Sequence, residues 1–138
     1  MPQTPLLALA SKKPKHLDDK LDMTTIVYGI PHCDSVKKVC AYLAEHSIAY
    51  TFHDYKKQGV PEGELYAWVK AKGWEALLNR RGTTWRGLDE NMKVAVIDTE
   101  SAMAVMLTHA STIKRPVVVA GEMIIVGVDL EALGKLAR

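Results

Sequence analysis

Two apolar tetrapeptides near the C-terminus are separated by only two residues, Gly121 and Glu122. The first, residues 117–120, is VVVA, and the second, residues 123–126, is MIIV. β-Branched and other large apolar residues of this kind favour strands, and a two-residue connection that begins with glycine is typical of a type II′ hairpin turn. The segment therefore predicts an antiparallel β-hairpin close to the end of the chain.

A strand, a helix and a second strand are predicted nearer the start of the sequence. Residues 25–28 are β-branched and aromatic, as expected for a buried strand, and residues 50–55 also have strand character. Between them, residues 35–45 carry apolar side chains at spacings of three and four, which is typical of an amphipathic helix. A right-handed β-α-β unit joined to the hairpin gives a four-stranded mixed sheet.

The part of the chain between these two strand pairs is predicted to be helical. Pro61 is placed as the first residue of a helix that runs to about residue 72 and is stopped by Gly73. Further helices are expected over residues 75–79, 91–97, 101–107 and, after a cap at Asp129, 130–136. The order is that of an α/β protein with the thioredoxin-like fold: a mixed sheet flanked by helices, with an all-helical insert at about 57–113.

Composition limits the partners that the chain can have. Its 138 residues, 48% hydrophobic and 25% charged, fit one globular domain over residues 23–138. A net charge of +2, spread along the chain, gives no reason to expect direct binding to nucleic acid. No apolar run approaches the roughly 20 residues that cross a bilayer, so no membrane partner is expected. Residues 1–22, charged and broken by proline, are interpreted as a disordered tail or a mis-annotated start.

Cys33 lies where the first predicted strand turns into the first predicted helix. The free N–H groups at a helix start point at a side chain in this position, and the helix dipole adds positive potential there. Both effects favour thiolate, so we expect the pKa of Cys33 to fall below the ordinary value of about 8.5. Lys37, one turn further along, adds positive charge. The alternative is a small buried hydrophobic residue, which is a common role for free cysteine.

The second cysteine, Cys40, lies on the apolar side of the same helix and is interpreted as structural. A seven-residue separation on a helix puts the two Cα atoms about 10 Å apart, whereas a disulfide tolerates at most about 7 Å. Val36 occupies the position that would complete a Cys-x-x-Cys motif. A second thiol must therefore come from outside, with glutathione as the candidate in a reducing cytoplasm. Two cysteines without clustered histidines predict no metal site.

Arg115 precedes Pro116 at the start of the hairpin. An X-Pro bond is where a cis peptide is least costly, and a cis bond here would present the backbone of Arg115 to an extended thiol peptide. The guanidinium would then bind a carboxylate or an oxyanion. A solvated cationic turn is the alternative interpretation. The functional interpretation requires that this segment and the Cys33 segment meet in space.

Five motifs that follow one another in the chain resemble the arsenate reductase-like (ArsC/Spx) family, and most closely its YffB-type branch. They are YGIPHCD at 28–34, FHDY at 52–55, GWEALLN at 73–79, RGTTWR at 81–86 and KRP at 114–116. The resemblance covers about residues 24–136. It implies a thioredoxin-like fold with a helical insert, Cys33 as the nucleophile, and Arg115 before a cis-Pro116. YffB-type proteins have been proposed to be glutathione-dependent thiol reductases.

The chain departs from the arsenate-reducing members of that family at two positions. Those members hold the oxyanion with three arginines, of which Arg115 matches one. Asn79 stands where the second is expected, with Arg80 and Arg81 beside it, and residues 126–127 (VG) stand where the third is expected. Each missing charge-assisted contact costs on the order of 1.5–3 kcal/mol of anion stabilisation. The resemblance therefore does not by itself predict arsenate reduction.

Three functions stay open on the sequence alone. In the leading hypothesis, a glutathione-dependent thiol reductase or thiol-transfer enzyme, the Cys33 thiolate accepts glutathione as a mixed disulfide that a second glutathione resolves. Arg115 and Arg81 would bind carboxylates. The alternatives are arsenate reduction linked to glutathione and glutaredoxin, and a non-catalytic, Spx-like regulator that binds RNA polymerase, although Val36 removes the usual Cys-x-x-Cys switch. The further candidate binding residues are Pro116, Arg80, Thr84, Lys37 and Lys56.

Overall fold

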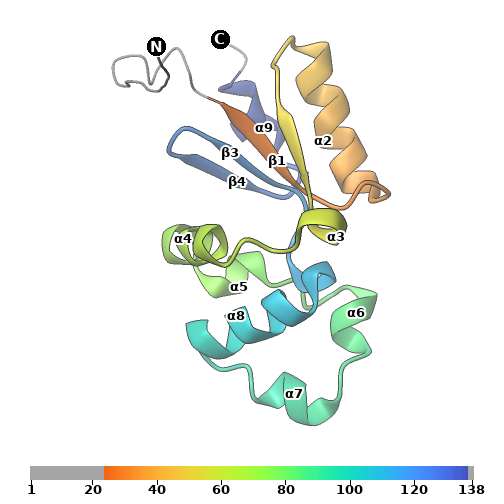
Figure 1. Cartoon of the computed structure of the whole chain (residues 1–138), viewed down its shortest axis with the longest axis vertical. Coiled ribbons are helices and arrows are strands. Elements are labelled where there is room, and N and C mark those ends of the chain that lie inside the picture. The colour runs from red at the N-terminus through yellow and green to blue at the C-terminus, as the bar shows by residue number, and fades with distance from the viewer. Residues whose placement is uncertain (1–23, 137–138) are drawn as a thin grey trace, which may run out of the picture.

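The computed structural model describes residues 24–136, so the expectation for residues 1–22 lies outside the described residues. Within the described part, a four-stranded mixed sheet has the order β2-β1-β3-β4 (Figure 1). β1 runs parallel to β2 and antiparallel to β3, and β3 pairs with β4 in an antiparallel hairpin. The bounds are β1 Thr25–Gly29, β2 Thr51–Asp54, β3 Val117–Ala120 and β4 Met123–Val126. The predicted sheet is confirmed.

The hairpin turn has the predicted geometry. Gly121 has a φ of 61°, whereas Glu122 is not among the described residues with positive φ. This combination belongs to a type II′ turn, in which the first central residue occupies a region that side chains disfavour. The glycine therefore sets the register in which Val117 pairs with Val126.

Helices and the loops between them make up the rest of the described chain. Their bounds are α2 Asp34–Glu45, α3 Tyr55–Gln58, α4 Glu62–Lys72, α5 Trp74–Leu77, α6 Thr83–Arg86, α7 Glu90–Val94, α8 Thr99–Thr108, the 3-10 turn η1 Ala110–Thr112, and α9 Leu130–Gly134. In residues 24–136 none of these helices has the length and apolar character needed to cross a membrane.

The structure corrects the predicted helices in two respects. Pro61 is the residue before α4 rather than its first residue, because its φ of −76° and ψ of 108° are extended. The short helices α3 and α6 were not predicted, since a single turn is too short to show a helical period. α3 forms because the Asp54 side chain accepts a hydrogen bond from the Lys56 backbone N–H at 2.8 Å.

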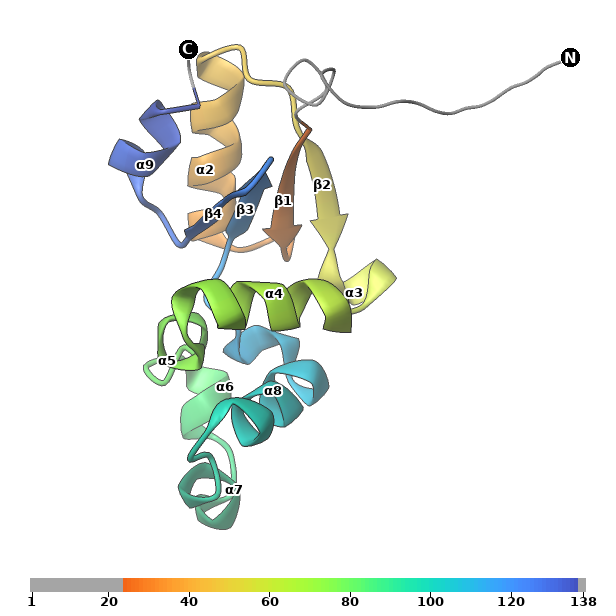
Figure 2. The same ribbon diagram turned by 90° about the vertical axis from the view of Figure 1, so that its left-hand side faces the viewer.

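Side chains from the two faces of the sheet contribute to two separate hydrophobic cores, because side chains alternate between the faces along a strand. One core lies under α2 and α9 and contains Val27, Val39, Leu43, Val118, Ile125 and Leu133. The other lies under the helices of the insert, and its members include Tyr28, Leu65, Trp68, Leu77, Met106 and Val117. Helices α2 and α9 thus cover one face of the sheet, and the insert packs at its end (Figure 2).

Trp68 links the insert to the sheet. Its side chain is 2% exposed, and its ring meets that of Tyr28 on β1 edge-on, with 4.7 Å between centroids. Removing a buried tryptophan typically costs about 3–5 kcal/mol. This packing holds α4 across the end of the sheet (Figure 2).

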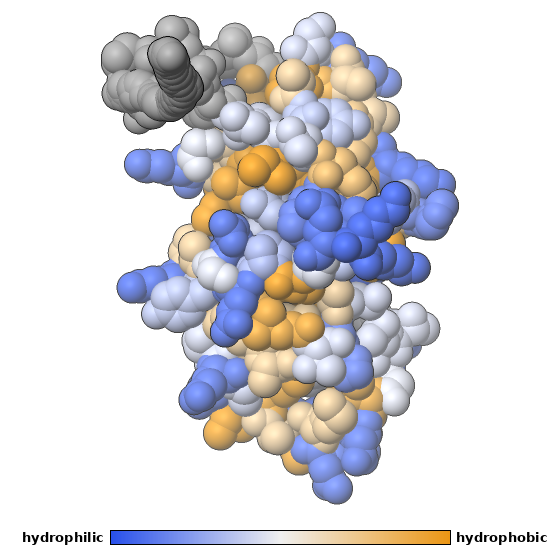
Figure 3. All heavy atoms as spheres, in the orientation of Figure 1, coloured by the Kyte–Doolittle hydropathy of each residue, from blue (hydrophilic) through white to orange (hydrophobic). Residues whose placement is uncertain are grey.

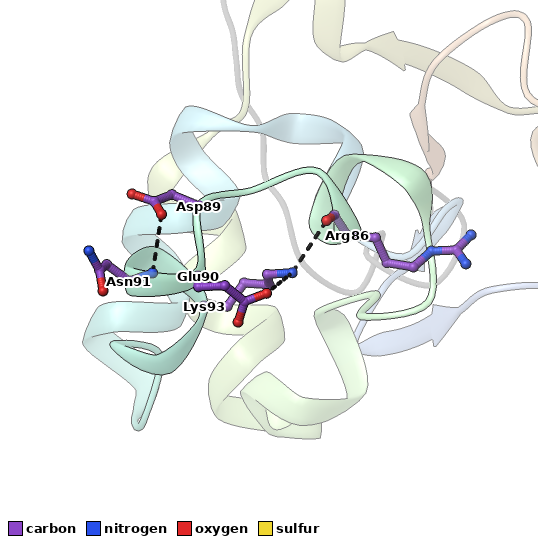
Figure 4. Close-up of polar contacts among 5 residues, drawn as sticks. All are labelled: Arg86, Asp89, Glu90, Asn91 and Lys93. Atoms are coloured by element: carbon purple, nitrogen blue, oxygen red, sulfur yellow. Dashed lines mark hydrogen bonds and ion pairs between the residues drawn. The ribbon is translucent and has the colours of Figure 1, made fainter.

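Polar contacts organise the far tip of the insert. The Lys93 ammonium lies 3.1 Å from the Glu90 carboxylate and donates to the Arg86 carbonyl at 3.3 Å (Figure 4). Asp89 caps α7 by accepting a hydrogen bond from the Asn91 N–H at 3.4 Å. The Arg86 guanidinium points away from these contacts. The tip also carries exposed apolar side chains, Val94 and Ile97, at the end of the molecule where Figure 3 shows apolar patches among charged ones.

Candidate active site

Three segments from distant parts of the sequence converge at one end of the sheet. Tyr28 at the end of β1 pairs with Val117 at the start of β3, and Val117 pairs with Val126 at the end of β4. The chain therefore leaves β1, enters β3 and leaves β4 at the same place, on the side of the insert (Figure 2). Cys33 and Arg115 line one cavity there, which confirms the expected meeting of their two segments.

The cavity is open to solvent and has a volume of about 430 Å³. Its lining combines a thiol, two cationic side chains, an amide, a hydroxyl and a short apolar stretch. The lining residues are Cys33, Ser35, Asn79, Lys114, Arg115, Val126, Gly127 and Val128. Positive charge beside a thiol suits an anionic substrate that carries sulfur.

Cys33 is the residue that precedes α2, with an extended backbone at φ −93° and ψ 130°. Its backbone N–H donates to the Ile30 carbonyl at 3.3 Å, and its own carbonyl accepts from the Lys37 N–H at 3.0 Å. The turn after β1 is thereby tied to the first turn of α2. The sulfur lies at the start of a twelve-residue helix, the placement predicted from the sequence.

The surroundings of Cys33 favour the thiolate. Burial raises the pKa of the thiol, but the Val36 N–H, the Arg115 side chain and the Ser35 N–H together outweigh it. The net result is a pKa below the ordinary value for cysteine. Helix-start N–H groups and a guanidinium are the two features that stabilise a nucleophilic sulfur anion.

Arg115 is held beside the thiol by its own backbone segment. Its Nη1 donates to the Ser111 carbonyl at 3.0 Å, and its peptide bond to Pro116 is cis. The Pro116 carbonyl accepts a hydrogen bond from the Gly127 N–H at 2.8 Å, which ties the end of β4 to this loop. Within residues 24–136 the buried Nε of Arg115 has no hydrogen-bond partner. The side chain thus keeps donor capacity beyond its contact with Ser111.

A short stretch of backbone pairing brings part of the insert to the cavity. Leu78 forms an isolated antiparallel bridge with Ile113. On either side of that bridge, the Asn79 N–H donates to the Thr112 carbonyl and the Lys114 N–H donates to the Leu77 carbonyl, both at 2.7 Å. This pairing places Asn79 and Lys114 in the lining next to Arg115.

Tyr55 is a buried residue whose phenol interacts electrostatically with Arg115. Its side chain is 3% exposed, and in the described part of the chain its hydroxyl finds no hydrogen-bond partner. Burial and the neighbouring Tyr28 raise the pKa of this phenol, while the charge of Arg115 acts in the opposite direction. The hydroxyl therefore stays protonated and neutral near the guanidinium.

The other predicted binding residues do not line the cavity. The Arg80 guanidinium lies over the Trp74 ring, 5.5 Å from its centroid. Arg81 is exposed, and its backbone N–H donates to the Asn79 side-chain oxygen at 3.1 Å. Lys37 and Lys56 are exposed on α2 and α3. Pro116 immediately precedes β3, and Thr84 lies on α6. Their roles in binding stay predictions.

Six lining residues were not among the predicted site residues: Ser35, Asn79, Lys114, Val126, Gly127 and Val128. Of these, Asn79 and the pair Val126 and Gly127 stand where the family resemblance places an arginine. Ser35 and Lys114 could have been predicted from the sequence, because each lies within two residues of a predicted site residue. Val128 had none, since a lone apolar residue after a strand looks like any other loop position. In residues 24–136 no group of His, Cys, Asp and Glu side chains is arranged to hold a metal ion.

The mixed four-stranded sheet, the cysteine at a helix start and the cis-proline loop beside it define a thioredoxin-like protein. The chain belongs to the ArsC family, whose family model matches residues 28–136. The resemblance inferred from the five motifs is thereby confirmed.

Individual relatives agree with this assignment. The solved structure of the YFFB (PA3664) protein is 43% identical, with a TM-score of 0.79 over 83% of this chain and 100% of that chain. An arsenate reductase (ArsC) related protein from Brucella melitensis is 40% identical, with a TM-score of 0.65 over 83% of this chain and 94% of that one. An uncharacterized protein from Haemophilus influenzae is 39% identical over 73% of this chain and 88% of its own length.

The two departures from the arsenate-reducing pattern fall in the cavity wall. Asn79, Val126 and Gly127 all line it, and none carries a charge. Arg115 and Lys114 therefore supply the cationic side chains of the lining. Such a wall stabilises a small, highly charged oxyanion less well than three converging guanidinium groups would.

Gly29 links the packing behind the site to the chemistry of Cys33. A Cβ at this position would lie 2.8 Å from Val36 Cγ2, so we expect Gly29→Ala to push the Val36 side chain, and with it the first turn of α2, away from β1. Because the Val36 N–H helps to lower the pKa of Cys33, we expect that pKa to rise in the variant. Overpacking of this kind typically also costs about 1–3 kcal/mol of stability. The pH dependence of iodoacetamide alkylation, in a Cys40→Ala background, measures the first effect, and thermal unfolding measures the second.

Gly63→Ala on α4 is the matched control, because an added Cβ there meets nothing within 4 Å. It should leave the alkylation profile of Cys33 unchanged. An unshifted profile in Gly29→Ala would show that the first turn of α2 does not set the thiol pKa.

Proposed function

We propose that this protein is a glutathione-dependent thiol reductase in which Cys33 forms a transient mixed disulfide with glutathione. The observation that carries the proposal is the contact of one cysteine, at a helix start and with a lowered pKa, with Arg115 in a cation-lined cavity. Glutathione carries two carboxylates and a thiol, so its charges complement Lys114 and Arg115 while its sulfur meets Cys33.

The reaction has two thiol–disulfide exchanges. In the first, the Cys33 thiolate attacks the glutathione sulfur of a disulfide R–S–S–G, the S–S bond breaks, and RS⁻ leaves and takes a proton from solvent. In the second, a glutathione thiolate attacks the glutathionyl sulfur on Cys33 and releases glutathione disulfide and the Cys33 thiolate. The net reaction converts R–S–S–G and one reduced glutathione into RSH and glutathione disulfide, so one reduced glutathione is consumed in each turnover.

The groups around the sulfur act in both exchanges. The Ser35 and Val36 N–H groups and Arg115 favour the thiolate, which makes Cys33 the nucleophile in the first step and a good leaving group in the second. Lys114 and Arg115 orient the carboxylates of glutathione, and Arg81 is a further candidate for that role at the exposed end of the Asn79 turn.

An external second thiol is required because the protein has no internal one within reach. Both cysteines are free, and Cys40 packs against the core under α2 and α9 instead of facing the cavity. Glutathione therefore serves as the resolving thiol in this mechanism.

Mass spectrometry of the intact protein tests the proposal. Incubation with glutathione disulfide should add one glutathione, located at Cys33 and absent from Cys40 by peptide mapping. Excess reduced glutathione should remove it, and the protein should catalyse the exchange with a small glutathione mixed disulfide in the presence of glutathione reductase. Protein that forms no adduct at Cys33 would contradict the mechanism.

Arsenate reduction is the alternative that the family membership favours. The uncharged wall formed by Asn79, Val126 and Gly127 argues that arsenate turnover is slow. Saturable reduction of arsenate with glutathione and glutaredoxin, lost in Arg115→Ala, would make this alternative the better description.

A further inference from the structure

The contacts proposed above for glutathione leave the apolar stretch of the cavity wall unused. Val126 and Val128 line the same cavity as the thiol, and the side chain of Val128 is 42% exposed. Leu130, two residues further on at the start of α9, is 52% exposed. Glutathione is a small polar tripeptide with two carboxylates, an amine and no hydrocarbon side chain. Its charges fit the other part of the lining, where Lys114 and Arg115 lie.

We infer that Val126 and Val128 form a subsite for an apolar group beside the sulfur of the leaving thiol. The inference rests on the proposed function and gives its substrate class: the mixed disulfide between glutathione and a protein cysteine that has an apolar neighbour. The glutathionyl half lies with Lys114 and Arg115, and the protein half lies with the valines. Cys33 is part of the lining shared by both halves.

The proposed step balances as in any thiol–disulfide exchange. The Cys33 thiolate forms a bond to the glutathione sulfur, the bond between that sulfur and the protein cysteine breaks, and the protein cysteine leaves as a thiolate. Reduced glutathione supplies the electrons in the next step. The apolar neighbour takes no part in the chemistry and contributes only binding.

The size of the expected preference follows from the area that the subsite covers. Burying one aliphatic side chain against another removes apolar surface from water and is typically worth about a factor of ten or more in binding. A difference of about 1.4 kcal/mol is a factor of about ten. A leucine beside the cysteine should therefore raise kcat/KM about tenfold over a serine at the same position.

Two glutathionylated peptides that differ only in this leucine or serine provide the test. Turnover is followed with reduced glutathione, glutathione reductase and NADPH. The wild-type protein should prefer the leucine peptide about tenfold, and Val128→Ser should lose most of that preference by slowing turnover of the leucine peptide. Val94→Ser is the matched control, because Val94 is an exposed valine, 70% accessible, on α7 and outside the cavity lining. It should retain the full preference.

The outcomes separate the two proposals. Equal turnover of both peptides, or a preference that survives Val128→Ser, would overturn the subsite while the glutathione mechanism stands. A preference for the serine peptide would overturn it as well. If neither peptide is turned over and Cys33 takes up no glutathione from the disulfide, the proposed function fails and the subsite fails with it.

Discussion

Cys33→Ser should reduce the exchange of glutathione mixed disulfides to the uncatalysed rate. A serine hydroxyl cannot form the sulfur–sulfur bond on which both steps depend. The substitution should leave the fold intact, because the Cys33 side chain is only partly buried and serine is well suited to the position before a helix. Steady-state turnover of the mixed disulfide of glutathione with 2-mercaptoethanol, together with thermal unfolding, measures both effects.

Cys40→Ser is the matched control for that experiment. Cys40 lies within α2 and packs at the margin of the core under α2 and α9, so its replacement should affect stability and leave turnover in place. If Cys33→Ser keeps wild-type turnover, or if Cys40→Ser abolishes it without unfolding the protein, Cys33 is not the nucleophile.

Arg115→Ala should slow the same reaction by about 10- to 100-fold in kcat/KM, as expected for the loss of a charge-assisted hydrogen bond worth about 1.5–3 kcal/mol. Arg115 lowers the pKa of Cys33, so that pKa should rise when the arginine is removed. The thiolate fraction then falls most at pH values between the wild-type and variant pKa. Above both pKa values only the loss in carboxylate binding should persist. A pH profile of kcat/KM separates the two contributions.

Arg86→Ala is the matched control, because its guanidinium points away from its neighbours on α7 and the residue does not line the cavity (Figure 4). Arg115→Lys should recover part of the effect, since it restores the charge without the planar group that reaches the Ser111 carbonyl. A profile for Arg115→Ala that is displaced equally at every pH would show that the arginine binds substrate but does not tune the thiol.

The elements that the sequence predicted well are those with a local pattern. Runs of β-branched residues predicted β1 and β3, the glycine at 121 predicted the hairpin turn, and the position of Cys33 between a strand and a helix predicted its lowered pKa. Each of these depends on residues that are neighbours in the chain. No knowledge of the tertiary fold was needed.

The parts that could not be predicted depend on contacts between distant residues. The bridge between Leu78 and Ile113 selects Asn79 and Lys114 for the cavity, and nothing in either local sequence announces that pairing. The same turn directs Arg80 to the Trp74 ring. The sequence predicted Arg80 and Arg81 as binding residues because they follow the position of the expected arginine. The backbone pairing instead places Asn79 in the cavity lining.

The separation of the two cysteines affects how long an oxidised form of Cys33 lasts. Cys33 immediately precedes α2, and Cys40 lies within it, seven positions further along. At the rise of a regular helix their Cα atoms are about 10 Å apart, too far for a bond between them. Cys40 therefore cannot reduce an oxidised Cys33 in the same molecule, as a neighbouring second thiol would. In the proposed mechanism, the lifetime of this oxidised form is set by how fast a thiol arrives from the surroundings.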